Sequence, residues 1–161
     1  MRVGLAIAAV VMLVGATVRA EAPAAPAEHT ATAGDQVKWG DAPPVLAKGA
    51  KLAVLYGDPS KDGLFIVRLK MPANYKISPH WHPTDENATV ISGSLAIGMG
   101  DKIDPKTKSL GPGAFYSLPA KMHHFAFTTK ETIVEVSALG PFQLNYINPE
   151  DDPSKAAAAA K

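Results

Sequence analysis

Residues 74–93 read NYKISPHWHPTDENATVISG, and this stretch decides the fold prediction. It places His80 and His82 two positions apart and Glu86 four positions further on. Side chains two positions apart on a β-strand point to the same face, so both imidazoles can point to one place. Pro83 bends the chain after the histidines, which allows Glu86 to return toward that place. The stretch therefore predicts half of a coordination shell for a divalent metal ion.

A second stretch, residues 113–124, reads GAFYSLPAKMHH and ends on two adjacent histidines. Strand alternation lets only one of His123 and His124 face the interior. One such histidine would complete a set of three nitrogens and one oxygen and leave positions open for water or substrate. A single half-buried histidine is usually just hydrogen-bonded to its surroundings. Three clustered neutral imidazoles would compete for partners, and a metal ion removes that cost.

The first stretch resembles the first motif of the cupin superfamily. That motif is a Gly, five residues, His-x-His, three or four residues, Glu, six residues and a Gly. His80, His82, Glu86 and Gly93 occupy those places. The resemblance implies that the two histidines and the glutamate are metal ligands.

The second stretch resembles the second cupin motif, with Gly113, Pro119 and His124 at the expected spacing. The motif spacing selects His124 as the fourth metal ligand, whereas a bulge at the start of the strand would select His123. The resemblance covers about residues 45–147. It implies an all-β fold, a single-domain cupin jelly-roll β-barrel.

Three positions depart from the cupin motifs. Asn74 stands where the first motif has its leading Gly, and Asn tolerates a positive φ better than other non-glycine residues. Lys121 replaces a Gly of the second motif, and we expect its side chain in water, although an inward position would let it meet an anionic ligand. Thr128 replaces an Asn. None of these positions is one of the four proposed ligands.

The rest of the chain also predicts short strands. The sequence contains 14 Pro and 13 Gly, which disfavours long helices and favours strands joined by turns. In residues 63–71, Phe65, Val67 and Leu69 alternate with Arg68 and Lys70, so we expect the apolar set to face inward. The expected strands are residues 51–56, 63–71, 89–91, 94–99, 114–118, 124–128, 132–138 and 143–147. The connection at residues 101–111 is long enough for a helical turn.

Composition excludes several classes of function. Sixteen basic and 15 acidic residues give a formal charge of +1 with no basic block, which argues against nucleic acid as a partner. The chain has no Cys, so disulfides, thiolate metal sites and cysteine nucleophiles are excluded.

The first residues resemble a targeting segment. A short positive start, an apolar run and a small-x-small site ending at Ala20 predict a signal peptide at residues 1–20, with a retained membrane anchor as the alternative. Residues 21–34 form an Ala/Pro/Thr-rich flexible leader, residues 35–150 the cupin domain and residues 151–161 a polar, Ala-rich tail. We therefore expect a periplasmic or secreted protein, with no stable membrane insertion after signal cleavage.

Other candidate site residues carry weaker signals. Asp85 can act as an acid or base, but a solvated loop position is the expectation. Glu135 can orient a ligand histidine from inside or form an outward charge on its strand, and the outward position is favoured. Met99, Phe115 and Tyr116 can line a pocket, although core packing explains most such residues.

Three functions are compatible with this cluster of histidines. The first is a metal-dependent enzyme of dioxygenase, isomerase or lyase type on a small-molecule substrate, with Glu86 also able to act as a base. The second is a non-catalytic cupin that binds a metal or a small ligand. The third is a scaffold with an empty histidine cluster. The mixed shell suits one divalent transition metal: Mn, Fe, Ni, Cu or Zn. The resemblance is also compatible with a homodimer that pairs sheet edges.

Overall fold

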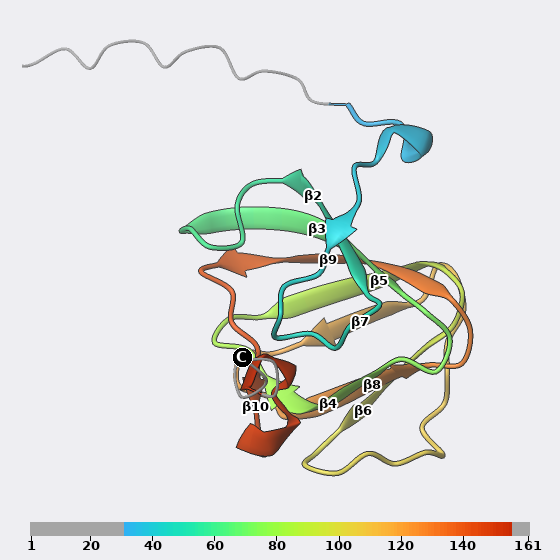
Figure 1. Ribbon diagram of the computed structural model, residues 1–161, viewed down its shortest axis with the longest axis vertical. Helices are drawn as coiled ribbons and strands as arrows, with labels where there is room; N and C mark the ends of the chain where they lie inside the picture. Colours follow the sequence, from blue (N-terminus) through green and yellow to red (C-terminus); the bar gives the residue numbers. More distant parts are fainter. Residues whose placement is uncertain (1–30, 156–161) are drawn as a thin grey trace, which may run out of the picture. The chain divides into compact units, whose positions relative to one another are not determined.

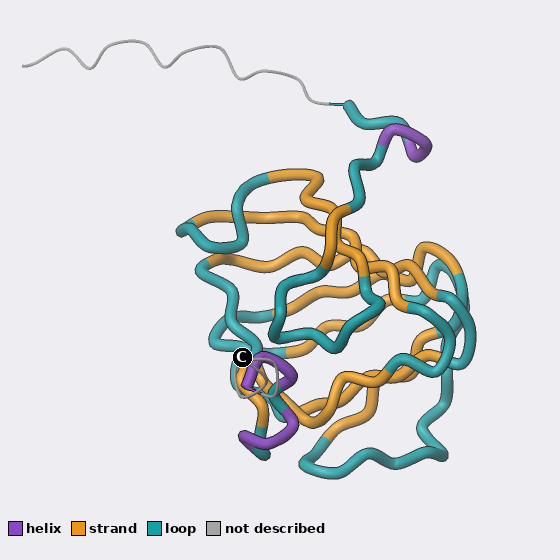
Figure 2. The backbone as a smooth tube through the Cα atoms, in the orientation of Figure 1, coloured by secondary structure: helices purple, strands orange, loops and turns teal. Residues whose placement is uncertain are grey.

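The computed structural model describes residues 31–155. Strands are the main regular secondary structure of this part of the chain, and its helical segments are short (Figure 2). The predicted signal peptide at residues 1–20, most of the predicted leader and the end of the predicted tail at residues 156–161 lie outside the described residues. Within residues 31–155, no helix has the length and apolar character needed to cross a membrane.

The larger of two antiparallel sheets has six strands. Their order across the sheet is β1 (Gly40–Asp41), β2 (Lys51–Tyr56), β3 (Gly63–Met71), β9 (Thr132–Gly140), β5 (Glu86–Ser92) and β7 (Phe115–Leu118). Strands distant in sequence are therefore neighbours. The long central pair β3 and β9 runs from Gly63 opposite Gly140 to Met71 opposite Thr132.

The smaller sheet has four strands, also antiparallel. Their order is β10 (Asn145–Tyr146), β4 (Lys76–Trp81), β8 (His124–Thr128) and β6 (Leu95–Met99). The two sheets face one another, and buried side chains from both form one core (Figure 1). Short 3-10 turns occur at Gly34–Gln36 and Pro149–Asp151. The predicted all-β jelly-roll fold is confirmed.

Strand β3 shows how alternation builds the core. Phe65, Val67 and Leu69 are buried, as the sequence pattern predicts, and each contributes about 1.5–3 kcal/mol by leaving water. On the opposite face, Arg68 Nε donates a 3.0 Å hydrogen bond to Oε2 of Glu135, which lies directly across from it on β9. Glu135 thus forms an outward cross-strand ion pair, the favoured of the two predicted positions.

Two strands were not among the ranges predicted from sequence. The two-residue β1 is too short to produce a pattern. Strand β4 contains Pro79, and its pairing with β8 shifts register between Ile77 and His80, which breaks the alternation that predicts strands. The connection at residues 101–111 is long enough for a helical turn, but it consists of turns, bends and an isolated bridge at Leu110.

The turns that frame the motifs require unusual backbone angles. Asn74 has φ 60° and Lys121 has φ 63°, and among the described residues they are the only non-glycine positions with positive φ. Both are positions where the cupin motifs have Gly. Gly93 ends the first motif with φ 86°, and a Cβ there would lie 2.3 Å from the carbonyl oxygen of Glu131. The backbone therefore keeps the turns of both motifs despite the two substitutions.

Candidate metal centre

Both sheets supply the side chains of the candidate centre. His80 lies near the end of β4, His82 follows that strand directly, and His124 begins β8. Strands β4 and β8 pair in a register that places His80 opposite His124. Glu86 begins β5 in the other sheet. The structure thus brings together the four residues that the sequence predicts as metal ligands.

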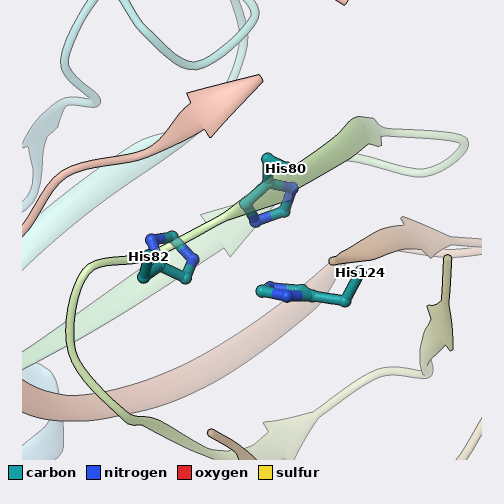
Figure 3. A group of neighbouring side chains, drawn as sticks. All are labelled: His80, His82 and His124. Carbon is teal, nitrogen blue, oxygen red and sulfur yellow. The ribbon is translucent and has the colours of Figure 1, made fainter. Parts of the chain in front are cut away.

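The three histidines form a tight buried group, with side chains directed toward one another (Figure 3). Their exposed fractions are 3%, 4% and 3% for His80, His82 and His124. Ring centroids are 4.2 Å apart for His80 and His124, and 4.9 Å apart for His80 and His82. One potential ligand atom from each residue lies within 4.8 Å of the other two, so one metal ion can be held among them.

Each imidazole is oriented by a hydrogen bond from Nδ1 to a backbone carbonyl. The acceptors are Ser78 for His80 at 2.8 Å, Gln143 for His82 at 2.7 Å and Met122 for His124 at 2.9 Å. A carbonyl oxygen only accepts, so Nδ1 must carry the proton in all three rings. In the neutral rings, each Nε2 therefore keeps its lone pair, which is the form that binds a metal.

The carboxylate of Glu86 lies against two of the three imidazoles. Its Oε2 lies 3.1 Å from Nε2 of His82 and 3.4 Å from Nε2 of His124. A carboxylate and two neutral Nε2 atoms are all acceptors, and acceptors at these distances require a cation between them. That cation is either a proton or a metal ion. The donor set of three imidazoles and one carboxylate therefore fits a divalent transition metal.

Burial sets the protonation of the group. Burial lowers the pKa of His80 from 6.5 to about 3, and the nearby charges of His124 and His82 act in the same direction. Burial raises the pKa of Glu86, but the hydrogen bonds and positive charges that His124 and His82 supply when Nε2 carries a proton outweigh this and hold the pKa of Glu86 below its usual 4.5. His80 is thus neutral and Glu86 ionised at neutral pH, as metal ligands must be.

A cavity of about 200 Å³ adjoins the group on one side. His80, His82 and Glu86 supply its polar wall, and all the other lining residues are apolar. They are Pro43, Val45, Leu46, Leu52, Pro59, Phe65, Val67, Leu69, Ile77, Val136, Phe142 and Leu144.

A smaller cavity of about 40 Å³ lies among His80, Glu86, His124 and further apolar side chains. Its volume is room for only one to three water-sized molecules. The larger cavity is therefore the one with room for an organic ligand.

The segment after β9 supplies functional contacts that the sequence did not reveal. The Phe142 ring stacks on His82, with centroids 4.2 Å apart and planes 18° from parallel. The carbonyl of Gln143 accepts the Nδ1 proton of His82, and Leu144 lines the larger cavity. This segment had been expected to form a strand at residues 143–147, but only Asn145–Tyr146 do so. No local motif signals such contacts, because they depend on long-range packing.

Several weaker sequence candidates lie away from the centre. The sequence favoured core packing over a pocket role for Met99 and Phe115, but they are 52% and 61% exposed and line neither of the two cavities described above. Tyr116 packs against the core and donates a 2.8 Å hydrogen bond to the carbonyl of Leu95. Lys121 is exposed, as expected. Asp85 accepts a 2.7 Å hydrogen bond from the amide of Ala120 and so joins the two motifs.

His123, the alternative ligand, is on the surface. Its Nδ1 donates a 2.6 Å hydrogen bond to Asp101, and its side chain is 43% exposed. Strand β8 begins at His124, whose side chain is the buried one. The bulge that would turn His123 inward does not occur.

Solved structures similar to this one carry the cupin fold. The polyketide cyclase RemF from Streptomyces resistomycificus is 19% identical, with a TM-score of 0.66 over 81% of this chain and 94% of that chain. A candidate acetylacetone dioxygenase from Methylibium petroleiphilum is 16% identical, with a TM-score of 0.61 over 85% and 98%. An RmlC-like cupin from Shewanella frigidimarina is 18% identical, with a TM-score of 0.55 over 70% and 91%.

Comparison of sequences gives the family. No curated protein matches the chain. The sequence profile of the family described as "Domain of unknown function (DUF4437)" matches residues 15–145. The chain therefore belongs to the DUF4437 family, and its fold is that of the cupins.

Proposed function

We propose that this protein is an exported metal-binding cupin that acts as a metal-dependent enzyme on a small molecule. His80, His82, Glu86 and His124 would hold one divalent transition metal ion. The metal would polarise a substrate oxygen or activate dioxygen. The reaction would be of the dioxygenase, isomerase or lyase type.

The convergence of four acceptor atoms carries this proposal. Backbone carbonyls bind the Nδ1 proton of all three imidazoles, so each ring has only Nε2 left for a ligand. The Glu86 carboxylate lies 3.1 Å and 3.4 Å from two of these nitrogens. A buried group of this composition is stabilised when a cation replaces the shared proton, and metal binding then releases protons.

Glu86 has a second part in the proposed reaction. In the part of the chain that the structure describes, it is the only carboxylate that lines the larger cavity. If it leaves the metal, its free oxygen can accept a proton from a ligand in that cavity. The folds of a polyketide cyclase and a candidate acetylacetone dioxygenase resemble this one, which supports a small-molecule substrate.

A non-catalytic binding protein is the second candidate. It is favoured by the absence, among the residues that line the larger cavity, of any acid or base other than the four proposed ligands. An enzyme that keeps Glu86 on the metal would have no group in the cavity to move a proton. Turnover of candidate substrates by the metal-loaded protein distinguishes the two functions.

Metal content tests the proposal directly. The mature protein, purified from the exported fraction without chelators or a His tag, should contain close to one transition metal ion per chain. The variants His80→Ala and His124→Ala should lose it, since each removes one of the converging nitrogens. His123→Ala is the matched control and should keep the metal, because His123 lies on the surface beside Asp101. A wild-type protein that takes up none of Mn, Fe, Ni, Cu or Zn would refute the metal site.

Export is the part of the proposal that rests on sequence alone. Residues 1–20 have the charge and apolar pattern of a cleaved signal. Mass spectrometry of the exported protein should find Glu21 as the first residue. A protein that keeps Met1 and stays with the cell would contradict the proposal.

A homodimer is the proposed assembly. Strands β1 and β7 are the edges of the larger sheet, and Phe115 of β7 is 61% exposed. Pairing of such an edge would cover both its unpaired backbone groups and this ring. Light scattering coupled to size exclusion should give twice the mass of one chain, whereas a monomer would exclude this assembly.

A further inference from the structure

The larger cavity offers a ligand almost no polar partners. Apart from His80, His82 and Glu86, its wall consists of aliphatic, proline and phenylalanine side chains. Within residues 31–155, no Lys, Arg, Ser, Thr, Asn, Gln or Tyr side chain lines it. A carboxylate, phosphate or sugar hydroxyl placed among these residues would lose its hydrogen bonds to water and gain none, which costs about 1–3 kcal/mol for each neutral group and more for a charge.

The charge of the centre limits the ligand as well. A divalent ion and the carboxylate of Glu86 together carry one positive charge, because the three imidazoles are neutral as ligands. A ligand with one negative charge neutralises the centre. A second negative charge would be buried without a cation in the cavity wall, and burial of an unpaired charge is strongly unfavourable.

The volume of the cavity indicates how many ligand atoms it can surround. An apolar cavity of about 150 Å³ in another protein binds benzene, which has six non-hydrogen atoms. In proportion, a cavity of about 200 Å³ holds about eight such atoms.

Two tyrosines hold part of the cavity wall in place. Tyr146 donates a 2.8 Å hydrogen bond to the carbonyl of Val45, and Tyr75 donates a 2.6 Å bond to that of Ala47. The side chains of Val45 and Leu46 line the cavity. The part of the wall formed by the loop at residues 45–47 is therefore fixed by hydrogen bonds as well as by packing.

We propose that the cavity selects a small, mainly hydrocarbon ligand of about eight non-hydrogen atoms that binds the metal through one or two adjacent oxygens and carries at most one negative charge. The inference rests on the proposed metal function for its oxygen contacts. The hydrocarbon preference comes from the cavity wall alone.

Three probe ligands separate the oxygen contacts with the metal from the hydrocarbon preference of the cavity wall. Catechol has eight non-hydrogen atoms, a hydrocarbon ring and two adjacent oxygens. Oxalate also binds a metal through adjacent oxygens in a five-membered chelate, but it carries two negative charges and no hydrocarbon. Benzene has only the ring. Isothermal titration would measure catechol and oxalate on the nickel-loaded protein, and ligand-observed NMR would measure benzene on the metal-free protein.

Filling the cavity tests its role. Leu52 lines the larger cavity but not the smaller one, so Leu52→Phe reduces the space of the larger cavity without replacing a residue that lines both. Oxalate should bind the wild-type protein more weakly than catechol, because of its second negative charge. In Leu52→Phe we expect catechol affinity to fall about tenfold and benzene binding to be lost, while oxalate affinity does not fall further. Leu64→Phe is the control, because Leu64 is 50% exposed on β3 and does not line the cavity. Leu144→Phe fills the same cavity from another segment if Leu52→Phe does not fold.

The outcomes distinguish this inference from the metal proposal. Benzene binding to the wild-type protein, with catechol but not oxalate weakened by the filling variants, would support the inference. Nickel uptake without benzene binding, or equal losses for catechol and oxalate, would overturn it and leave the metal function standing. Benzene binding without nickel uptake would overturn the metal function and support the hydrocarbon preference alone.

Discussion

His123 and His124 are neighbours in the chain, yet each has a carboxylate partner in a different environment. His123 forms an exposed pair with Asp101, at 2.6 Å, whereas His124 is buried in a group with Glu86, His80 and His82. The surface pair is surrounded by water, which satisfies both groups in any protonation state. The buried group is shielded from water, so its acceptor atoms need a cation among them. The same side-chain chemistry therefore predicts a metal centre only where the backbone buries it.

The largest expected difference between His123 and His124 is in the stability that a bound metal adds to the protein. At free zinc a thousandfold above its Kd, binding should add about 4 kcal/mol to the free energy of unfolding of the wild-type protein. His124→Ala should abolish this gain, and His123→Ala should retain it. Denaturant titration with and without zinc makes the measurement. An equal gain in both variants would show that zinc binds elsewhere.

The acid stability of the metal-free protein should depend on the buried group. The folded-state pKa of His80 is about 3, below its ordinary 6.5. As pH falls, the ring of His80 is therefore protonated at a higher pH in the unfolded chain than in the folded protein. The corresponding stability is present above pH 6.5 and is lost as pH falls toward 3, by about 3 kcal/mol between pH 6.5 and pH 4. The lowered pKa of Glu86 adds a loss in the same direction below about pH 4.5.

Unfolding by urea at a series of pH values tests this dependence. His80→Gln should flatten the slope between pH 4.5 and pH 6.5, because it removes the titrating ring. His123→Gln should leave the slope as it is. A slope that survives His80→Gln would assign the acid sensitivity to other groups.

The stacking of Phe142 on His82 should contribute a smaller amount. Phe142→Ala removes a ring from the cavity wall and from His82, and should cost about 2 kcal/mol of unfolding free energy, less than for a fully buried Phe. Phe115→Ala, at a position 61% exposed, should cost less than about 0.5 kcal/mol. Chemical denaturation of both variants makes the comparison. Similar losses in the two variants would mean that the stacking of Phe142 on His82 adds no measurable free energy of unfolding.

The surface pair itself should matter least. Asp101→Asn should change the free energy of unfolding by less than about 1 kcal/mol, because exposed ion pairs contribute little. Metal content should be unchanged. A loss of bound metal in Asp101→Asn would mean that the surface pair and the buried centre are coupled, which the account excludes.

The grouping of the four proposed ligands could be predicted from the sequence because the information that places them is local. The two-residue spacing of His80 and His82 and the motif position of Glu86 survive in the folded chain without any long-range knowledge. The choice of His124 over His123 depended on motif spacing, and the structure agrees on which side chain is buried. Their role as metal ligands stays a prediction that metal analysis must test.

The cavity was not predictable in the same way. Phe142 and Leu144 reach it from a segment that follows β9, and Val45 reaches it from a loop before β2. None has a neighbour in sequence that signals the site. The core packing favoured for Met99 and Phe115 is also not found, because an apolar side chain at a sheet end or edge can stay exposed. Burial at sheet margins depends on what other segments cover.

X-ray absorption spectroscopy of the zinc-loaded protein tests the central claim most directly, since it counts the ligands of the bound ion. The account predicts three imidazole nitrogens and at least one oxygen at about 2.0–2.2 Å in the wild-type protein and in His123→Ala, and no such zinc spectrum in His124→Ala, which should not retain the ion. A zinc ion with one imidazole or none, or a wild-type spectrum unchanged by His124→Ala, would contradict the assignment of the buried group as the metal centre.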